Sequence, residues 1–156
     1  MRKIDMQIAS LNRNYVDEPT KQVLQNLVNK KRKMEKYRQK RFSAQMFTFI
    51  TSIIFLLYIY FSIIKYSLGN IGFIISSILN DSLHIVVVLV IAGGYATALY
   101  FKKKEDKTEN EFQSLRCEVV RKSTDYWPQP ELWERRHEVL QMMKKEFDIN
   151  LFQESK

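Results

Sequence analysis

The side chains best suited to chemistry are few in this chain and lie far apart in the sequence. There are two histidines, His84 and His137, and one cysteine, Cys117. No CxxC, HExxH, GxSxG or glycine-rich phosphate loop occurs, and the four glycines all lie between residues 69 and 94. We therefore predict that the protein is not an enzyme and that it holds no metal ion and no cofactor.

Asp81 and His84 are three residues apart, so they would share one face of a helix. Such a pair could sense pH or bind a metal ion. We favour a simpler interpretation, in which Asp81 or Ser82 caps a helix and His84 is a polar residue near a membrane surface.

The charged residues are distributed very unevenly. Residues 1–41 hold twelve Lys and Arg against four Asp and Glu, residues 42–101 hold one of each sign, and residues 102–156 hold twelve of each. The whole net charge of +8 therefore comes from the part ahead of residue 42. This pattern excludes a uniformly solvated globule and a disordered chain, and it indicates a membrane protein with ends in water.

Two segments are long and apolar enough to cross a bilayer. Residues 42–64 are 23 uncharged residues, and residues 83–101 are 19 residues whose only titratable group short of tyrosine is His84. A buried helix in a soluble core is the alternative for the first segment, and a buried strand at 85–91 is the alternative for part of the second. A domain this small can hardly bury a helix on all sides, so we predict two transmembrane helices.

The loop at 65–82 contains an apolar run at 71–79, which is too short to cross the membrane and is predicted to be an interfacial or re-entrant helix. The fifteen residues before the first span hold eight Lys and Arg, the fifteen after the second hold five, and the loop holds one. The positive-inside rule then predicts a plasma-membrane protein with two spans and both termini in the cytoplasm.

A basic cluster precedes the first span, and we expect it to set the topology and to contact an anionic inner leaflet, at about 1 kcal/mol for each basic residue. A nucleic acid is a less favoured partner, because the cluster is not part of a recognisable nucleic-acid-binding fold and the neutral tail offers no second basic surface. The cluster consists of Lys30, Lys31, Arg32, Lys33, Lys36, Arg38, Lys40 and Arg41.

The arm at 1–41 and the tail at 102–156 are predicted to be cytoplasmic and helical, with amphipathic helices at about 20–41, 105–126 and 130–147. Pro128 and Pro130 separate the last two. The predicted fold is an all-α membrane protein: a two-span helical hairpin whose cytoplasmic extensions form a small antiparallel bundle. The open alternative is that these helices remain separate and bind other proteins.

Two sets of residues are candidates for helix packing or docking. In the second span, small residues let another helix approach closely, either the first span or a second copy: Gly93, Gly94, Thr97 and Ala98. In the tail, two tryptophans beside the proline turn either fasten a hairpin, anchor a partner or lie at the lipid headgroups. The candidate docking or bundle surface is Trp127, Trp133, Arg136, Leu140 and Phe147.

The two spans, the turn WPQPELWERR and the ending MMKKEFDINLFQESK resemble the YpbF-like family of small membrane proteins from Bacillus and its relatives. The resemblance extends from the basic arm to the C-terminus and is strongest in the last thirty residues. It implies a bacterial plasma-membrane setting, and it implies no activity and no site, because the family is functionally uncharacterised.

The expected function is that of a non-catalytic membrane adaptor or scaffold, whose cytoplasmic helices dock an unidentified protein or a second copy. The alternative is an oligomeric transport or pore-forming protein, since two spans can line a pore only in a ring. Against a pore, the spans hold no charged residue at their centres.

Overall fold

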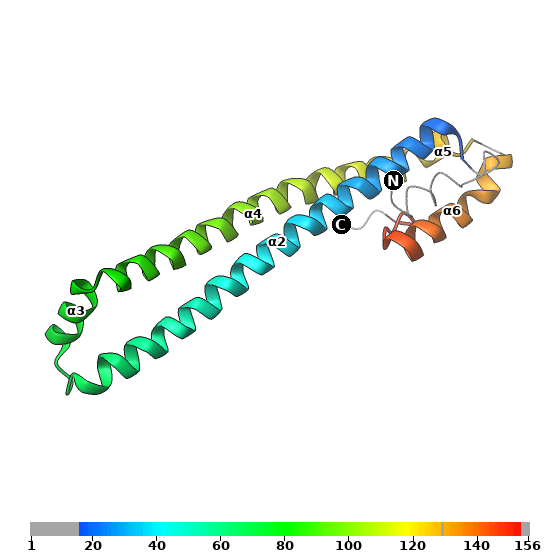
Figure 1. The fold of residues 1–156 in the computed structure, drawn as a ribbon. Helices are drawn as coiled ribbons and strands as arrows, with labels where there is room; N and C mark the ends of the chain where they lie inside the picture. Colours follow the sequence, from blue (N-terminus) through cyan, green and yellow to red (C-terminus); the bar gives the residue numbers. More distant parts are fainter. Residues whose placement is uncertain (1–15, 129, 154–156) are drawn as a thin grey trace. The chain divides into compact units, whose positions relative to one another are not determined.

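The computed structural model describes residues 16–128 and 130–153, and most of these residues are helical (Figure 1). No strand occurs in this described part of the chain, which confirms the predicted all-α class. In chain order the elements are α2 (Glu18–Ser62), the 3-10 turn η1 (Ile64–Tyr66), α3 (Ile71–Asn80), α4 (Ser82–Arg121), α5 (Ser123–Tyr126) and α6 (Glu131–Phe147).

Helix α2 is a single helix of 45 residues that joins the helix predicted at about 20–41 to the first apolar segment, and no Gly or Pro interrupts the chain between Thr20 and Leu68. Its start follows from local chemistry: Pro19 stands in the first turn, where its missing N–H is not needed, and Glu18 complements the helix dipole. The N–H of Lys21 donates to the carbonyl of Asp17, at 2.9 Å, and closes the first turn.

Among the described residues, two helices are long and apolar enough to cross a membrane, α2 and α4. Only 11% of the residues in the most apolar stretch of each helix are buried. A helix in the core of a soluble protein buries most of its apolar residues, so these two stretches do not have the burial of core helices.

The structure divides into two compact units, each described separately below. One comprises the described residues up to Glu35 together with those from Asp106 onward, and we call it the terminal unit. The other is Lys36–Glu105, and we call it the hairpin unit. Helices α2 and α4 contribute residues to both.

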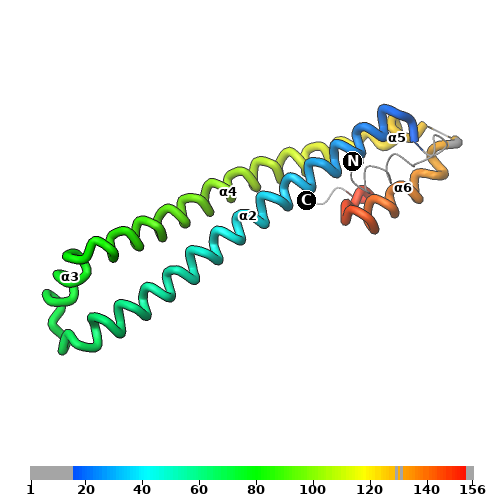
Figure 2. Tube along the Cα trace, in the orientation of Figure 1, coloured from blue at the N-terminus to red at the C-terminus, as the bar shows by residue number. Residues whose placement is uncertain are grey.

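In the hairpin unit, α2 and α4 run in opposite directions and are joined through η1 and α3 (Figure 2). Gly69 has a φ of +82°, a conformation that glycine adopts at little cost, and it lets the chain turn before α3. The side chain of Asn70 caps α3 by accepting from the N–H of Phe73, at 3.2 Å. The apolar run expected at 71–79 is therefore helical, as α3.

The terminal unit has a hydrophobic core to which α2, α4, α6 and the segments next to α5 and α6 all contribute. Trp127 is the largest fully buried side chain of this core, and Leu24, Leu27 and Met143 are fully buried as well. The buried core residues are Val16, Leu24, Leu27, Val28, Phe112, Val119, Trp127, Val139, Leu140, Met143, Ile149 and Leu151.

The helix predicted at about 105–126 is divided in two in the structure. Helix α4 continues without a break from Ser82 to Arg121, and Lys122, with φ −91° and ψ 23°, separates it from α5. The last predicted helix, at about 130–147, corresponds closely to α6. After α6, Asp148 adopts the left-handed conformation at φ 53°, and the N–H of Ile149 donates to the carbonyl of Met143.

Candidate functional site

Of the residues predicted to form a docking or bundle surface, Trp127 and Leu140 lie inside the core of the terminal unit. Trp127 is fully buried and Leu140 is 3% exposed. The indole N–H of Trp127 has no hydrogen-bond partner among the described residues. These two side chains therefore pack within the protein, and no partner protein can reach Trp127 while the core is intact.

Trp133, Arg136 and Phe147 lie at the edge of that core. Trp133 and Phe147 are half-buried and pack against it. The guanidinium carbon of Arg136 lies 4.1 Å from the centroid of the Trp133 ring, which is cation–π geometry. Arg136 also donates from Nη1 to Oγ of Ser123, at 3.4 Å. Arg136 is thus held by its contacts with Trp133 and Ser123, and the stack of Trp133 and Arg136 is partly open to solvent.

Two residues that were not part of the predicted docking surface, His137 and Phe152, lie close to this stack. Phe152 is 39% exposed, and its ring centroid is 5.5 Å from that of His137 on α6. Phe152 and Arg136 both line a small hollow of about 50 Å³ beside Trp127. Trp133, Arg136, His137 and Phe152 therefore form one partly exposed surface, which we call the aromatic edge.

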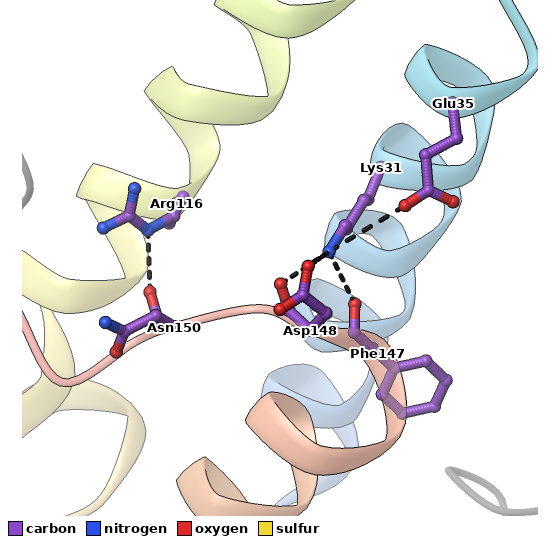
Figure 3. A network of polar contacts seen from close by, with 6 residues as sticks. All are labelled: Lys31, Glu35, Arg116, Phe147, Asp148 and Asn150. Carbon is purple, nitrogen blue, oxygen red and sulfur yellow. Dashed lines mark hydrogen bonds and ion pairs between the residues drawn. The ribbon is translucent and has the colours of Figure 1, made fainter. Parts of the chain in front are cut away.

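The basic cluster contains one lysine that points into the terminal unit (Figure 3). Lys31 is 8% exposed, and its Nζ donates to the carbonyl oxygens of Phe147 and Asp148 and to Oδ2 of Asp148. The same ammonium is 3.9 Å from Oε1 of Glu35. Lys31 therefore satisfies carbonyl groups at the C-terminal end of α6, where a positive charge is favourable.

Two carboxylates of the terminal unit have pKa values lowered by lysines of the basic cluster, Lys31 and Lys30. The hydrogen bond and charge of Lys31 lower the pKa of Asp148. Lys30 lies 2.8 Å from Oε2 of Glu111 and lowers the pKa of that carboxyl in the same way. Both carboxylates are open to solvent, so these ion pairs are screened.

Arg116 on α4 fastens the end of the described chain. It is 6% exposed, its Nε donates to the carbonyl of Asn150 at 2.7 Å (Figure 3), and its Nη2 donates to the carbonyl of Gln153 at 2.8 Å. Together, Lys31 and Arg116 hold the segment after α6 against α2 and α4 within the terminal unit. The sequence gives no local sign of either contact.

In the hairpin unit, two arginines of the basic cluster meet a buried carboxylate. Glu105 is 3% exposed, and its oxygens lie 3.3 Å from Nε of Arg38 and 3.1 Å from Nε of Arg41. Lys40 lies over the ring of Phe101, with Nζ 5.5 Å from the centroid. These contacts join α2 to α4 at the end of the hairpin unit that holds the basic residues.

The remaining members of the predicted basic cluster face outward to different degrees. Lys33 and Lys36 are exposed, whereas Arg32 is half-buried and makes contacts of its own. The cluster thus contains buried or half-buried residues engaged within the protein, such as Lys31 and Arg41, and exposed residues, such as Lys33 and Lys36. Lys40 is exposed and also contacts Phe101.

The small residues of α4 differ in what they face. An added Cβ at Gly94 would lie 2.5 Å from Oγ1 of Thr48, so α2 and α4 approach closely there, and Ala98 is 4% exposed. A Cβ at Gly93 would meet nothing within 4 Å, and Thr97 is exposed and donates to the carbonyl of Gly93. Of the four predicted small residues, Gly94 and Ala98 therefore face the packing between the two helices of the hairpin unit, and Gly93 and Thr97 do not.

Asp81 caps α4, as predicted: its Oδ1 accepts from the N–H of Leu83 at 2.9 Å. Its other oxygen, Oδ2, lies 3.8 Å from Nε2 of His84. No group of three or more His, Cys, Asp or Glu side chains that could hold a metal ion occurs in the described ranges.

In the part of the chain that the structure describes, these features define a small all-helical protein with two helices long and apolar enough to span a membrane. The chain belongs to the family described as "Protein of unknown function (DUF2663)", which matches residues 23–154. It is 41% identical over 142 residues to "Uncharacterized protein YpbF" of Bacillus subtilis (strain 168), covering 91% of this chain and 93% of that protein. The predicted YpbF-like family is therefore confirmed, and no solved structure matches the chain.

Proposed function

We propose that this protein is a non-catalytic integral membrane protein whose terminal unit is a cytoplasmic docking module. In this proposal the hairpin unit crosses the membrane twice, both termini are in the cytoplasm, and the terminal unit binds a partner protein or a second copy. The helices of the terminal unit pack on one another as a small bundle, and the docking surface is the aromatic edge.

The position of exposed apolar side chains supports membrane insertion. Among the described residues, 29 large hydrophobic side chains are exposed, and all but Phe152 lie between Phe42 and Tyr100. Leu83 at 68% and Leu56 at 64% are examples. Soluble proteins rarely expose a continuous apolar surface of this extent, whereas lipid requires one.

The charge pattern supports the orientation. Lys and Arg are concentrated next to the ends of the two apolar stretches, and the connection between them holds Lys65 alone. The exposed lysines of the basic cluster, Lys33, Lys36 and Lys40, are then available to anionic lipid headgroups.

The folded core of the terminal unit is the observation that carries the docking proposal. A membrane anchor needs only its apolar helices and flanking charges. The terminal unit has in addition a core built from segments more than 100 residues apart in the chain, and Oγ1 of Thr20 donates to the carbonyl of Tyr126 between two of them. On this core, the aromatic edge exposes tryptophan, arginine and phenylalanine. Tryptophan and arginine are enriched at the centres of protein interfaces.

In-cell cross-linking followed by purification in mild detergent tests this proposal. Truncation before Trp127 is a poor test, because it removes five of the buried core residues beyond Trp127 and so unfolds the module. The sharper variant is Trp133→Ala with Phe152→Ala, which removes the tryptophan and phenylalanine side chains of the aromatic edge and leaves every fully buried core residue in place. The matched control is Glu138→Ala with Lys145→Ala, two exposed positions on α6.

We expect the wild type and the control to recover the same cross-linked protein, and the aromatic-edge variant to recover much less of it. Equal recovery by all three proteins would refute the aromatic edge as the docking surface. Recovery of the chain itself and nothing else would assign the edge to self-association, and ion flux through proteoliposomes would then test the oligomeric pore.

A further inference from the structure

A cavity of about 450 Å³ lies between α2 and α4 in the hairpin unit, near the start of α4. Its walls include Thr51, Phe55 and Tyr58 of α2 and Leu83, His84 and Val87 of α4. This volume falls within the range of ligand-binding pockets, and most of the lining is hydrocarbon. The docking function proposed above makes no use of it.

His84 is the unexplained polar group of this cavity. The residue is 5% exposed, and neither ring nitrogen has a hydrogen-bond partner among the described residues. The rings of Phe55 and Tyr58 flank the imidazole, with centroids 6.0 and 5.6 Å away. A buried polar group without a hydrogen-bond partner costs free energy, so a histidine at this position favours a partner beyond those that the described residues supply.

The chemistry of the missing partner follows from the imidazole. A neutral imidazole has one N–H donor and one acceptor nitrogen. A ligand that satisfies both therefore offers an oxygen that accepts from the N–H and a hydroxyl that donates to the other nitrogen. An anionic ligand is disfavoured, because Oδ2 of Asp81 lies 3.8 Å from Nε2 of His84. The polar end of the ligand is therefore uncharged and carries both a hydroxyl and a carbonyl oxygen.

The body of the ligand follows from the walls. Ile54 and Leu83, which also line the cavity, are 62% and 68% exposed on its outer side, so the cavity opens on an apolar surface. If the hairpin unit crosses the membrane, this surface faces acyl chains, and His84, two residues after the start of α4 and beside Phe55 and Tyr58, lies toward the outer end of the two spans. The occupant then enters from the lipid.

We propose that the cavity around His84 binds an uncharged hydroxyl-bearing lipid of the diacylglycerol class. The ester carbonyl accepts from the imidazole N–H, the free hydroxyl donates to the other ring nitrogen, and one acyl chain lies along Phe55 and Val87. This inference rests on the membrane insertion that is part of the proposed function, and it is independent of partner docking.

The test uses the full-length protein in liposomes that contain a photoreactive diacylglycerol, with a photoreactive phosphatidic acid of the same acyl chains as the anionic probe. We expect the diacylglycerol probe to label the lining of the cavity and unlabelled diacylglycerol to compete. His84→Phe, which keeps the ring size and loses both hydrogen-bonding atoms, should reduce labelling about tenfold, as for one to two lost hydrogen bonds. His84→Gln, which retains a donor and an acceptor, should retain most of the labelling.

Filling the cavity is the second test. Val87→Trp should block labelling, whereas Val88→Trp, at an exposed position of the same helix that does not line the cavity, should not. Equal labelling by both probes, full labelling of His84→Phe, or labelling spread evenly over α2 and α4 would each overturn the lipid site and leave water as the partner of His84.

Alkaline extraction of the same liposomes separates the two possible failures. A chain that resists extraction but is not labelled at the cavity refutes the lipid site alone. A chain that extraction removes from the liposomes refutes the membrane insertion and the lipid site together.

Discussion

The ammonium of Lys31 lies 2.9 Å from Oδ2 of Asp148, a residue 117 positions away in the chain. Lys31 is 8% exposed, and the same ammonium also donates to the carbonyl of Phe147. One lysine of a cluster that would ordinarily be assigned to the membrane surface therefore stabilises the end of α6 instead.

Replacing Lys31 with Met should destabilise the terminal unit. The change leaves the carbonyls of Phe147 and Asp148 without their charged donor, and a hydrogen bond to a charged group contributes roughly 1.5–3 kcal/mol. Hydrogen exchange of the α6 amides in the full-length protein should become faster. Lys33→Met, at an exposed position of the same helix, is the control and should leave the exchange unchanged.

The terminal unit should also lose some stability in acid. The pKa values of Asp148 and Glu111 are lowered in the folded protein by Lys31 and Lys30, so each carboxylate stabilises the fold above its unfolded pKa. That contribution is lost as the pH falls from about 4.5 through the lowered values. Both groups are open to solvent, so the loss is small.

Thermal unfolding at several pH values measures this effect. Asp148→Asn with Glu111→Gln removes both carboxylates, and its stability should depend less on pH below about 4.5 than that of the wild type. An identical acid dependence in the two proteins would show that other carboxylates dominate it.

Gly94 and Gly93 should differ sharply in their tolerance of a side chain. Gly94→Ala places a Cβ 2.5 Å from Oγ1 of Thr48, which is held by a hydrogen bond to the carbonyl of Ala44, so either that hydrogen bond breaks or α2 and α4 move apart. Overpacking of this kind costs typically about 1–3 kcal/mol. Gly93→Ala meets nothing within 4 Å and serves as the control.

Thermal unfolding in detergent compares these variants. The combination of Gly94→Ala with Thr48→Ala should recover much of the lost stability, because it removes the oxygen that the new Cβ meets. Failure of the second change to rescue the first would mean that the helices do not approach at this point.

The elements of this fold could be predicted from the sequence because they depend on local chemistry. Pro19 and Glu18 mark the start of α2, Asp81 caps α4, and the two prolines around position 129 precede α6. Each signal acts within one or two helical turns, so neighbouring residues are sufficient to determine it.

The contacts of the candidate site could not be predicted in the same way, because their partners are far apart in the chain. Nothing near Lys31 distinguishes it from Lys33, yet one is buried against Asp148 and the other is exposed. Likewise, Glu105 is one of several acids after the second apolar stretch, and only the packing of α2 against α4 places it between Arg38 and Arg41.

The two tryptophans of the turn should separate folding from docking. Trp127→Ala empties a fully buried position, and deletion of a buried aromatic ring costs about 3–5 kcal/mol, so the terminal unit should become much less stable. Trp133→Ala removes a half-buried ring at the surface of the same core and should cost considerably less. Thermal unfolding and hydrogen exchange of α6 measure both effects in the full-length protein.

Recovery of the cross-linked partner should depend on the two tryptophans in a different order from stability. Under the docking proposal, Trp133→Ala lowers recovery of the cross-linked protein while its fold persists, because Trp133 and Arg136 form the exposed stack. Trp127→Phe keeps an aromatic ring in the core and should retain both stability and recovery to a large extent. If Trp133→Ala recovers as much partner as the wild type while Trp127→Phe does not, the docking surface lies elsewhere on the terminal unit and depends on the core around Trp127.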